Sequence, residues 1–278
     1  MAADVSREEV ERILQGINIP PRPSLLGEVD RELGHADPDL RRTAALIGKD
    51  VALSAAVLKT LNSPLFALRS RVANIPQAVM LLGARNTRCV ISGLVLRNSL
   101  SSAAASLERF WDSAEKVASI NAYICTRLPR APREEAYALG LFRDCGIPLL
   151  MQRFPDYRET LKLAANHERA LTEVERVRHG TTHNAVGGIV GRNWGLSDAV
   201  CQAIHHHHRP MVVAEDSVLP LVKTLVAVNF LAEHIIETSL NLRPDPLWEA
   251  HAGSVLDHLE MSDDVYYEIE ENALAMFN

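Results

Sequence analysis

The sequence feature that most constrains the fold of this chain is the way helix caps and helix stops frame its apolar stretches. Ser6 and Glu9 have the spacing of a capping box, and Asp50 and Asn86 each stand just before an apolar stripe of helical periodicity. Glycine and proline fall at the ends of these stripes, as Gly83 does. No stretch alternates apolar and polar residues as a half-buried strand would. The sequence therefore predicts an all-α fold.

The segment from Ser99 to Ser106, SLSSAAAS, predicts a hinge between two helical lobes. Its residues are small and mostly polar, as in a connection between packed units. We expect the N-terminal lobe to end at about residue 103 and the second lobe to begin at about residue 107, with one long helix over 107–128. At 278 residues and 47% hydrophobic side chains, the chain is long enough to bury a sizeable core.

Nothing in the sequence predicts export or insertion into a membrane. No stretch of 18 or more apolar residues is present, and the first ten residues, MAADVSREEV, lack an apolar signal core. The cysteines have no CxxC spacing, so we expect reduced, mostly buried thiols in a cytoplasmic protein. They are Cys89, Cys125, Cys145 and Cys201.

Charge is distributed unevenly along the chain, although the formal net charge is only −6. Residues 51–107 contain six basic residues and no acidic one, whereas residues 214–278 carry 13 carboxylates against two basic residues, a balance of −11. The basic segment is a solvated face, a docking patch for an acidic protein surface, or a contact for a nucleotide or nucleic acid. The acidic net charge disfavours nucleic acid, so we expect a protein partner to dock there. The residues expected to bind it are Arg69, Arg71, Arg85 and Arg88.

The segment 179–210 holds six of the eleven histidines. Thr182 and Ser197 have the positions of N-caps for two helices within it. Imidazoles brought together at neighbouring helix ends, with a carboxylate from elsewhere, are what a hydrolytic metal site needs. The sequence therefore makes this segment the first place to look for a functional site.

The four consecutive histidines at 205–208 cannot all face one site. Successive helical residues are turned by about 100°, so only His205 and His208 share a side. Cys201, His205 and His208 have the spacing i, i+4, i+7, which would suit a surface zinc or nickel ion. A buried cysteine beside solvated histidines is the alternative that we favour for this trio.

Two polar residues outside that segment need partners. Asp144 is expected at the end of a helix, where the negative end of the helix dipole disfavours a carboxylate by about 0.3–1 kcal/mol. We therefore expect a cationic or hydrogen-bonding partner for it. Asn229 lies on an otherwise apolar helical stripe, so its amide must be satisfied inside the protein.

Laid out in this order, the chain resembles the HDOD family, the bacterial signalling relatives of the HD phosphohydrolases. The resemblance runs from about residue 19 to 212, so we expect an HDOD domain over 19–213, an N-terminal helix over 1–18, and a helical extension over 214–278 that completes the second lobe. The matching motifs are Ile19-Pro20-Pro21-Arg22-Pro23, Leu61-Asn62-Ser63-Pro64 with Phe66, Ile75-Pro76-Gln77-Ala78 to Leu82-Gly83, Phe110-Trp111, Gly140-Leu141-Phe142-Arg143-Asp144-Cys145-Gly146, Thr182-His183-Asn184-Ala185-Val186-Gly187, Trp194-Gly195-Leu196, Ala203-Ile204 and His207-His208-Arg209-Pro210.

The resemblance also implies what an active site would contain. An active HD enzyme binds its metal through a histidine on an earlier helix, a His-Asp pair, further histidines and a final aspartate. Here the helix 107–128 contains no histidine, Arg143 replaces the histidine of the pair, and Asn229 takes the place of the final aspartate. An arginine side chain has no lone pair with which to bind a metal. The positions that keep a ligand type are Asp144, His183, His207 and His208.

We therefore expect a degenerate site with no metal and no cofactor, in which these side chains form a hydrogen-bonded polar core. The expected function is that of a non-enzymatic regulator that binds other signalling proteins, such as those of cyclic-dinucleotide or two-component pathways; self-association is compatible with this function. One alternative is a metal-dependent phosphohydrolase with an altered site, acting on a nucleotide or cyclic dinucleotide. Another is nucleotide or nucleic-acid binding through the basic N-terminal lobe.

Overall fold

The computed structural model of the chain describes residues 13–14, 16–62, 70–101, 107–129, 131–166, 170–240 and 245–275. Throughout these ranges the regular elements are helices, and no strand occurs among them. The predicted all-α fold is therefore confirmed. The predicted capping box of the first helix, the loop with Phe66 and the centre of the predicted hinge, residues 102–106, lie outside the described residues.

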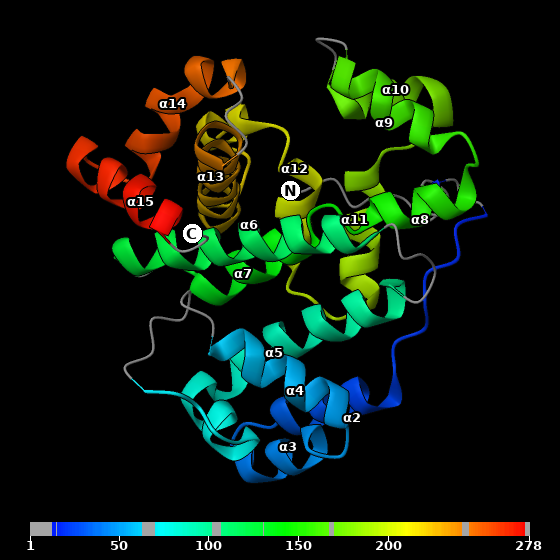
Figure 1. Cartoon of the computed structure of the whole chain (residues 1–278), viewed down its shortest axis with the longest axis vertical. Coiled ribbons are helices and arrows are strands. Elements are labelled where there is room, and N and C mark those ends of the chain that lie inside the picture. The colour runs from blue at the N-terminus through cyan, green and yellow to red at the C-terminus, as the bar shows by residue number, and fades with distance from the viewer. Residues whose placement is uncertain are drawn as a thin grey trace.

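Four helices form the lower part of the molecule in Figure 1. They are α2 (Ser24–Leu33), α3 (Leu40–Ile47), α4 (Val51–Leu61) and the first half of α5 (Ile75–Ser101). Asp50 caps α4 as predicted, because its carboxylate accepts a hydrogen bond from the Leu53 backbone N–H at 2.9 Å. The side chain of Asn62 bonds both backbone groups of Val72, at 2.9 and 2.7 Å, which ties the end of α4 to the approach of α5.

Helix α5 bends sharply at Gly83, where the sequence predicted a stop. The glycine has φ 72° and ψ 177°, a conformation that side chains with a Cβ strongly disfavour. The two halves, Ile75–Ala84 and Asn86–Ser99, are inclined by 115°. Within the described ranges, no single helix combines the length and apolarity of a membrane span; only the two halves of α5 taken together across their bend reach both.

The centre of the molecule is the pair α6 (Glu108–Arg127) and α7 (Arg133–Phe142), which cross the middle of Figure 1. A Cβ on Gly140 would lie 2.4 Å from the Ala118 Cα, so the glycine lets these two backbones approach closely. Helix α13 (Pro220–Ile235) packs on both and is buried along most of its length.

The remaining helices cover this centre on two sides. On one side lie α8 (Gly146–Arg153), α9 (Tyr157–Asn166) and α10 (Leu171–His179), followed by the packed pair α11 (His183–Asn193) and α12 (Asp198–His206). On the other lie the short helix η3 (Pro210–Ala214), the π-helical turn η4 (Ile236–Leu240), α14 (Pro246–His258) and α15 (Asp263–Ala275). This arrangement brings the turn after α7 next to the start of α11 and the end of α12.

Candidate functional site

The site begins at the turn that joins α7 to α8. Helix α7 ends at Phe142, so Asp144, which was predicted at the end of this helix, stands in the turn two residues beyond it. A Cβ on Gly146 would lie 2.1 Å from the backbone oxygen of His183, so only a glycine lets the start of α11 come this close to the turn. Gly146 thereby brings His183 to the carboxylate of Asp144.

His183 is the first residue of α11 and is fully buried. The predicted cap of this helix is present, because the Thr182 hydroxyl accepts a hydrogen bond from the Ala185 backbone N–H. The Nδ1 of His183 lies 2.8 Å from the Oε2 of Glu175, and the backbone N–H of His183 donates to the same oxygen at 3.1 Å. Glu175 therefore holds the Nδ1 proton and directs the Nε2 of His183 into the site.

Glu175 is a site residue that sequence reasoning missed. It is completely buried on α10 and also accepts a hydrogen bond from the Tyr157 hydroxyl. His179, one helical turn after Glu175, contacts the Thr160 hydroxyl at 2.8 Å and stacks on Phe154. No sequence signal marked Glu175, because its burial follows from how α10 packs in the fold.

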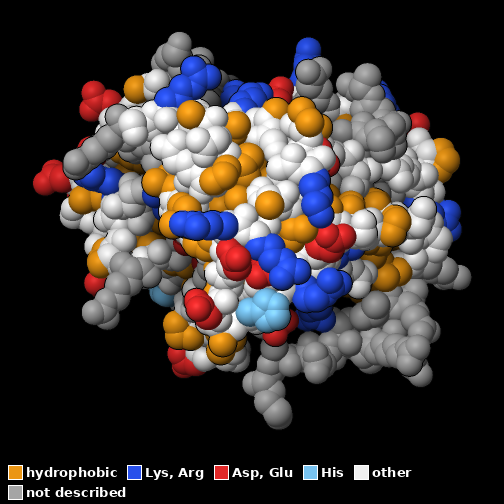
Figure 2. Space-filling model, turned by 90° about the horizontal axis from the view of Figure 1, so that it is seen from below, with side chains coloured by type: hydrophobic (Ala, Val, Ile, Leu, Met, Phe, Trp, Pro, Cys, Tyr) orange, Lys and Arg blue, Asp and Glu red, His pale blue; other side chains and the backbone are white. Residues whose placement is uncertain are grey.

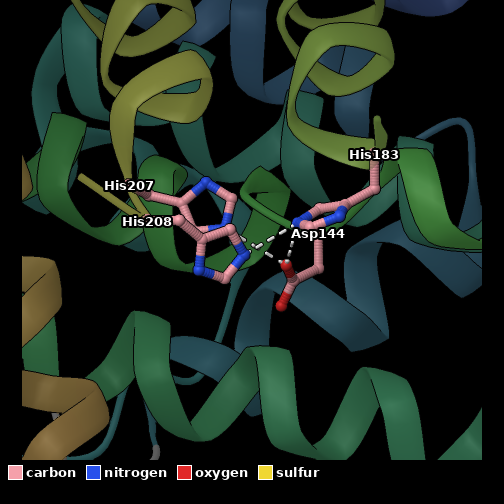
Figure 3. Close-up of side chains that lie close together, drawn as sticks. All are labelled: Asp144, His183, His207 and His208. Atoms are coloured by element: carbon pink, nitrogen blue, oxygen red, sulfur yellow. Dashed lines mark hydrogen bonds and ion pairs between the residues drawn. The ribbon is translucent and has the colours of Figure 1, made fainter. Parts of the chain in front are cut away.

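His207 and His208 both face the site because α12 ends at His206 and the next two residues lie in a turn. The Nδ1 of His207 donates to the Ile204 carbonyl at 2.7 Å, which fixes its tautomer. Its Nε2 is buried without a hydrogen-bond partner and lies 3.3 Å from Asp144 Oδ1. The Nε2 of His208 lies 2.9 Å from the Nε2 of His183 (Figure 3).

Together, Asp144, His183, His207 and His208 form one compact cluster. Their potential ligand atoms all lie within 4.8 Å of one another, and Asp144 Oδ1 is 3.4 Å from His183 Nε2. His183 and His207 already donate their Nδ1 protons to protein oxygens. In each ring, Nε2 is therefore the nitrogen whose lone pair can bind a metal. This donor set fits a divalent transition-metal ion, and the buried Nε2 of His207 is the atom that such an ion would satisfy.

Without an ion, protons distribute unevenly over the cluster. Burial alone would raise the pKa of Asp144, but the Arg143 guanidinium and the facing His207 imidazole hold it well below its usual range. Burial lowers the pKa of His207, yet the facing Asp144 carboxylate outweighs it and raises that pKa. Burial and the neighbouring histidines lower the pKa of His208 far below its ordinary value. These shifts favour a charged imidazolium at His207 and a carboxylate at Asp144, and they favour the neutral form of His208.

Arg143 closes one side of this cluster. Its Nη2 lies 3.1 Å from Asp144 Oδ2, its Nε donates to Glu233 Oε1 at 2.6 Å, and its Nη1 donates to the Gly140 carbonyl at 2.7 Å. The residue is 6% exposed, and although burial disfavours its charge, the two carboxylates raise its pKa. A permanent positive charge is therefore fixed beside Asp144.

Asn229, predicted as a position of the degenerate site, bonds a residue of α6. Its Oδ1 accepts a hydrogen bond from Asn121 Nδ2 at 3.2 Å, and Asn121 also donates to the Ala136 carbonyl at 2.9 Å. Among the described residues, the contacts of Asn229 do not reach the four-residue cluster. Glu233 lies one helical turn later on α13 and bonds Arg143 beside the cluster.

The zinc or nickel site that the spacing of residues 201–208 would allow is not assembled. The trio Cys201, His205 and His208 does not converge, because the thiol of Cys201 is buried near the Leu196 carbonyl while His208 faces His183. Burial also raises the pKa of Cys201 to about 11.

The four arginines predicted to bind a partner differ in their surroundings. Arg88 is paired with Asp30 at 3.2 Å and Arg71 is exposed, whereas Arg69 and the side chain of Arg85 lie outside the described part of the chain. Arg22 also pairs with Asp30, so this one carboxylate is shared by two arginines and neutralises Arg88 only in part.

Comparison with known proteins places these observations in context. Residues 19–210 match the sequence profile described as the HDOD domain. A protein from Treponema pallidum (strain Nichols), named only as uncharacterized, is 25% identical over 218 residues. That match covers 76% of this chain but 42% of the relative, so this chain spans less than half of the relative's length.

Two solved structures share the fold. An HDOD domain protein of unknown function from Geobacter sulfurreducens aligns with a TM-score of 0.68 and 22% identity, over 96% of each chain. A protein from Shewanella amazonensis SB2B that bears the provisional name of a phosphohydrolase aligns with a TM-score of 0.72 and 21% identity, over 95% of this chain and 93% of its own. These similarities show the common all-α fold.

Proposed function

Because the chain belongs to the HDOD domain family, a signal-transduction family related to phosphohydrolases, we propose that it is a non-enzymatic signalling regulator that acts by binding other proteins. The observation that carries this proposal is Arg143, which by the resemblance to active HD enzymes takes the place of a histidine ligand. Its guanidinium bonds Asp144 on one side and Glu233 on the other.

Arg143 changes the chemistry of the cluster in two ways. It cannot bind a metal or accept a proton, so it removes one ligand and one candidate base. It also supplies the positive charge that a cation would otherwise bring to Asp144, and it occupies the second oxygen of that carboxylate. One carboxylate oxygen of Asp144 is left for any ion in the cluster.

The neighbouring positions support the same proposal. A hydrolytic metal site needs enough protein ligands to hold the ion and an open position for water. By the resemblance, α6 would supply the first histidine ligand. It presents Asn121 instead, and the side-chain amide of Asn121 donates to Asn229. Two amides bonded to each other form a structural contact between α6 and α13.

The test is an activity assay on protein loaded with manganese, iron or zinc. Cyclic dinucleotides and a generic phosphodiester are the substrates, and the His183→Ala variant is the background control. We expect wild-type turnover equal to that background. Arg143→His alone should also remain inactive, because a first histidine and a final aspartate would still be absent. Turnover by the loaded wild type above the His183→Ala background would refute the proposal.

A second candidate, a metal-dependent phosphohydrolase with an altered site, is favoured by one observation. The Nε2 atoms of His183, His207 and His208 converge with Asp144 Oδ1, and the His207 atom has no hydrogen-bond partner. These four residues would hold the ion, which would supply a Lewis acid. The same assay separates the two candidates. Metal binding without turnover would indicate a sensory or structural ion. Metal binding with turnover would indicate the enzyme.

The third alternative, nucleotide or nucleic-acid binding through the basic segment, receives less support. Arg88 is partly neutralised by Asp30, which it shares with Arg22, and Arg97 bonds Glu115 at 2.6 Å. These pairings reduce the positive charge that a phosphate would meet. Binding of nucleic acid that weakens steeply with salt would restore this alternative.

A further inference from the structure

A cavity of about 450 Å³ lies between α2 and α3. Three arginines, one histidine and two glutamates line it, so with the histidine neutral the charged side chains leave a surplus of one positive charge. They are Arg22, Arg31, Arg42, His35, Glu28 and Glu32. Figure 2 looks at the lower part of the molecule in Figure 1, where these two helices lie, and shows basic and acidic side chains mixed around a histidine. A volume of several hundred Å³ is typical of pockets for small organic molecules.

Both carboxylates that line the cavity already have a cation beside them. Glu32 is buried, and its Oε2 lies 3.1 Å from the Nε of Arg42. The Oε2 of Glu28 lies 4.0 Å from the Nζ of Lys49. The two aspartates between α2 and α3 do not line the cavity, and one of them caps α3. These carboxylates therefore leave the charge of the two remaining arginines for a ligand.

Those two arginines are only partly compensated within the chain. Arg31 is exposed and, among the described residues, has no ion-pair partner. Arg22 shares the carboxylate of Asp30 with Arg88, so one negative charge serves two guanidinium groups. Burial and the nearby charge of Arg88 lower the pKa of Arg22, which means that its charge lacks full compensation. An anion in the cavity would supply it.

A glycine keeps one wall of the cavity open. Gly27 lies within α2 and lines the cavity. A glycine inside a helix is unfavourable compared with alanine. A Cβ at this position would meet no heavy atom within 4 Å, so packing inside the chain does not require the glycine. The missing side chain instead exposes the helix backbone to the cavity, as at places where a ligand approaches a backbone closely.

We propose that this cavity binds a small phosphorylated molecule. Arg22 and Arg31 would hold the phosphate, because a guanidinium group pairs with phosphate oxygens through two parallel hydrogen bonds. The imidazole of His35 would donate a further hydrogen bond. A phosphomonoester carries about −1.5 to −2 charges at pH 7, which matches two incompletely compensated arginines. The organic part of the ligand would lie along Gly27 and Leu46, because phosphate alone would leave much of the cavity empty.

This inference does not rest on the proposed signalling role, so its test stands apart from the activity assay. The full chain is titrated in a calorimeter with inorganic phosphate, phenyl phosphate and benzoate. We expect phenyl phosphate to bind at least tenfold more tightly than inorganic phosphate, because its ring covers the apolar part of the cavity. Benzoate has the same ring but a single negative charge, and should bind more weakly than phenyl phosphate. Absence of saturable binding of both phosphates at millimolar concentration would overturn the proposal, as would benzoate that binds as tightly as phenyl phosphate.

Variants of the cavity make the test specific. Arg31→Gln should weaken the binding of phenyl phosphate at least tenfold, because a charge-assisted hydrogen bond is lost. Its matched control is Arg176→Gln on α10, an exposed arginine that also has no ion-pair partner among the described residues. Gly27→Leu should abolish binding with no loss of melting temperature, because the new side chain fills the cavity. Its matched control is Gly253→Leu on α14, where a Cβ also meets nothing within 4 Å. Both controls should bind like the wild type.

The pattern across the variants locates the bound phosphate. Loss of affinity in both cavity variants and wild-type affinity in both controls supports the site between α2 and α3. Unchanged affinity of Arg31→Gln or of Gly27→Leu refutes it. Phosphate could also meet the cations of the four-residue cluster, so His183→Ala is titrated as well. If that variant is folded and alone loses binding, the anion lies at the cluster and the proposal is refuted.

Discussion

Replacing Arg143 by methionine should destabilise the fold by about 3 kcal/mol near neutral pH. The change leaves Asp144 and Glu233 facing one another without the guanidinium, and it removes the donor to the Gly140 carbonyl. Breaking one side of a buried ion pair costs about 3–5 kcal/mol. The lower end applies here because the side chains of Asp144 and Glu233 keep 19% and 25% of their exposure.

The pH dependence of this loss has a definite sign. The pKa of Asp144 lies well below its usual range in the folded protein, so its contribution to stability is present above the unfolded pKa of about 3.9 and is lost as the pH falls through the folded pKa. In Arg143→Met much of that contribution is absent at every pH. The difference in unfolding free energy between wild type and variant should therefore shrink as the solution becomes acidic.

Urea denaturation at several pH values, with a chelator present, measures this difference. The control is Arg127→Met, because Arg127 pairs with Glu268 on the surface, where their side chains are 37% and 44% exposed. An exposed pair contributes about 0–1 kcal/mol, so the control should lose little. Equal losses for both variants, or a loss for Arg143→Met that does not change with pH, would refute the reasoning.

Three further predictions follow from the site. Gly146→Ala should destabilise the protein by several kcal/mol in urea titrations, because the new Cβ would meet the His183 backbone oxygen at 2.1 Å. Gly253→Ala on α14, where the space around the glycine is open, should stabilise the protein by up to about 1 kcal/mol. The reverse order of stabilities would contradict this packing. In chelator-treated protein, NMR should show that His207 titrates with a pKa above the ordinary histidine value. Its stabilising contribution is then present below the unfolded pKa of about 6.5 and is lost as the pH rises through the folded pKa. Asp144→Asn should lower the pKa of His207, and an unchanged titration would argue against the pairing of these two residues. Glu175→Gln should weaken any zinc binding by about 10–100-fold in calorimetry, because the His183 Nδ1 loses its carboxylate, and unchanged affinity would show that Glu175 does not orient the ligand.

The sequence alone determined the helices and many of their boundaries. Thr182, Ser197 and Asp50 cap helices where their spacing predicted, and Gly83 breaks α5 with a positive φ. The ordered motifs also indicated the family before any coordinates. These features are readable because a cap or a stop depends on residues within about one helical turn.

The tertiary structure decided which side chains meet in the site. Helical periodicity placed His205 and His208 on one side, yet His207 and His208 face Asp144 because α12 ends at His206. The Arg143–Glu233 pair joins residues 90 positions apart, and the phase of α13 relative to α7 decides that Glu233 bonds Arg143 while Asn229 bonds Asn121. Such contacts follow from how apolar helix faces are buried against one another, and local spacing does not encode that packing.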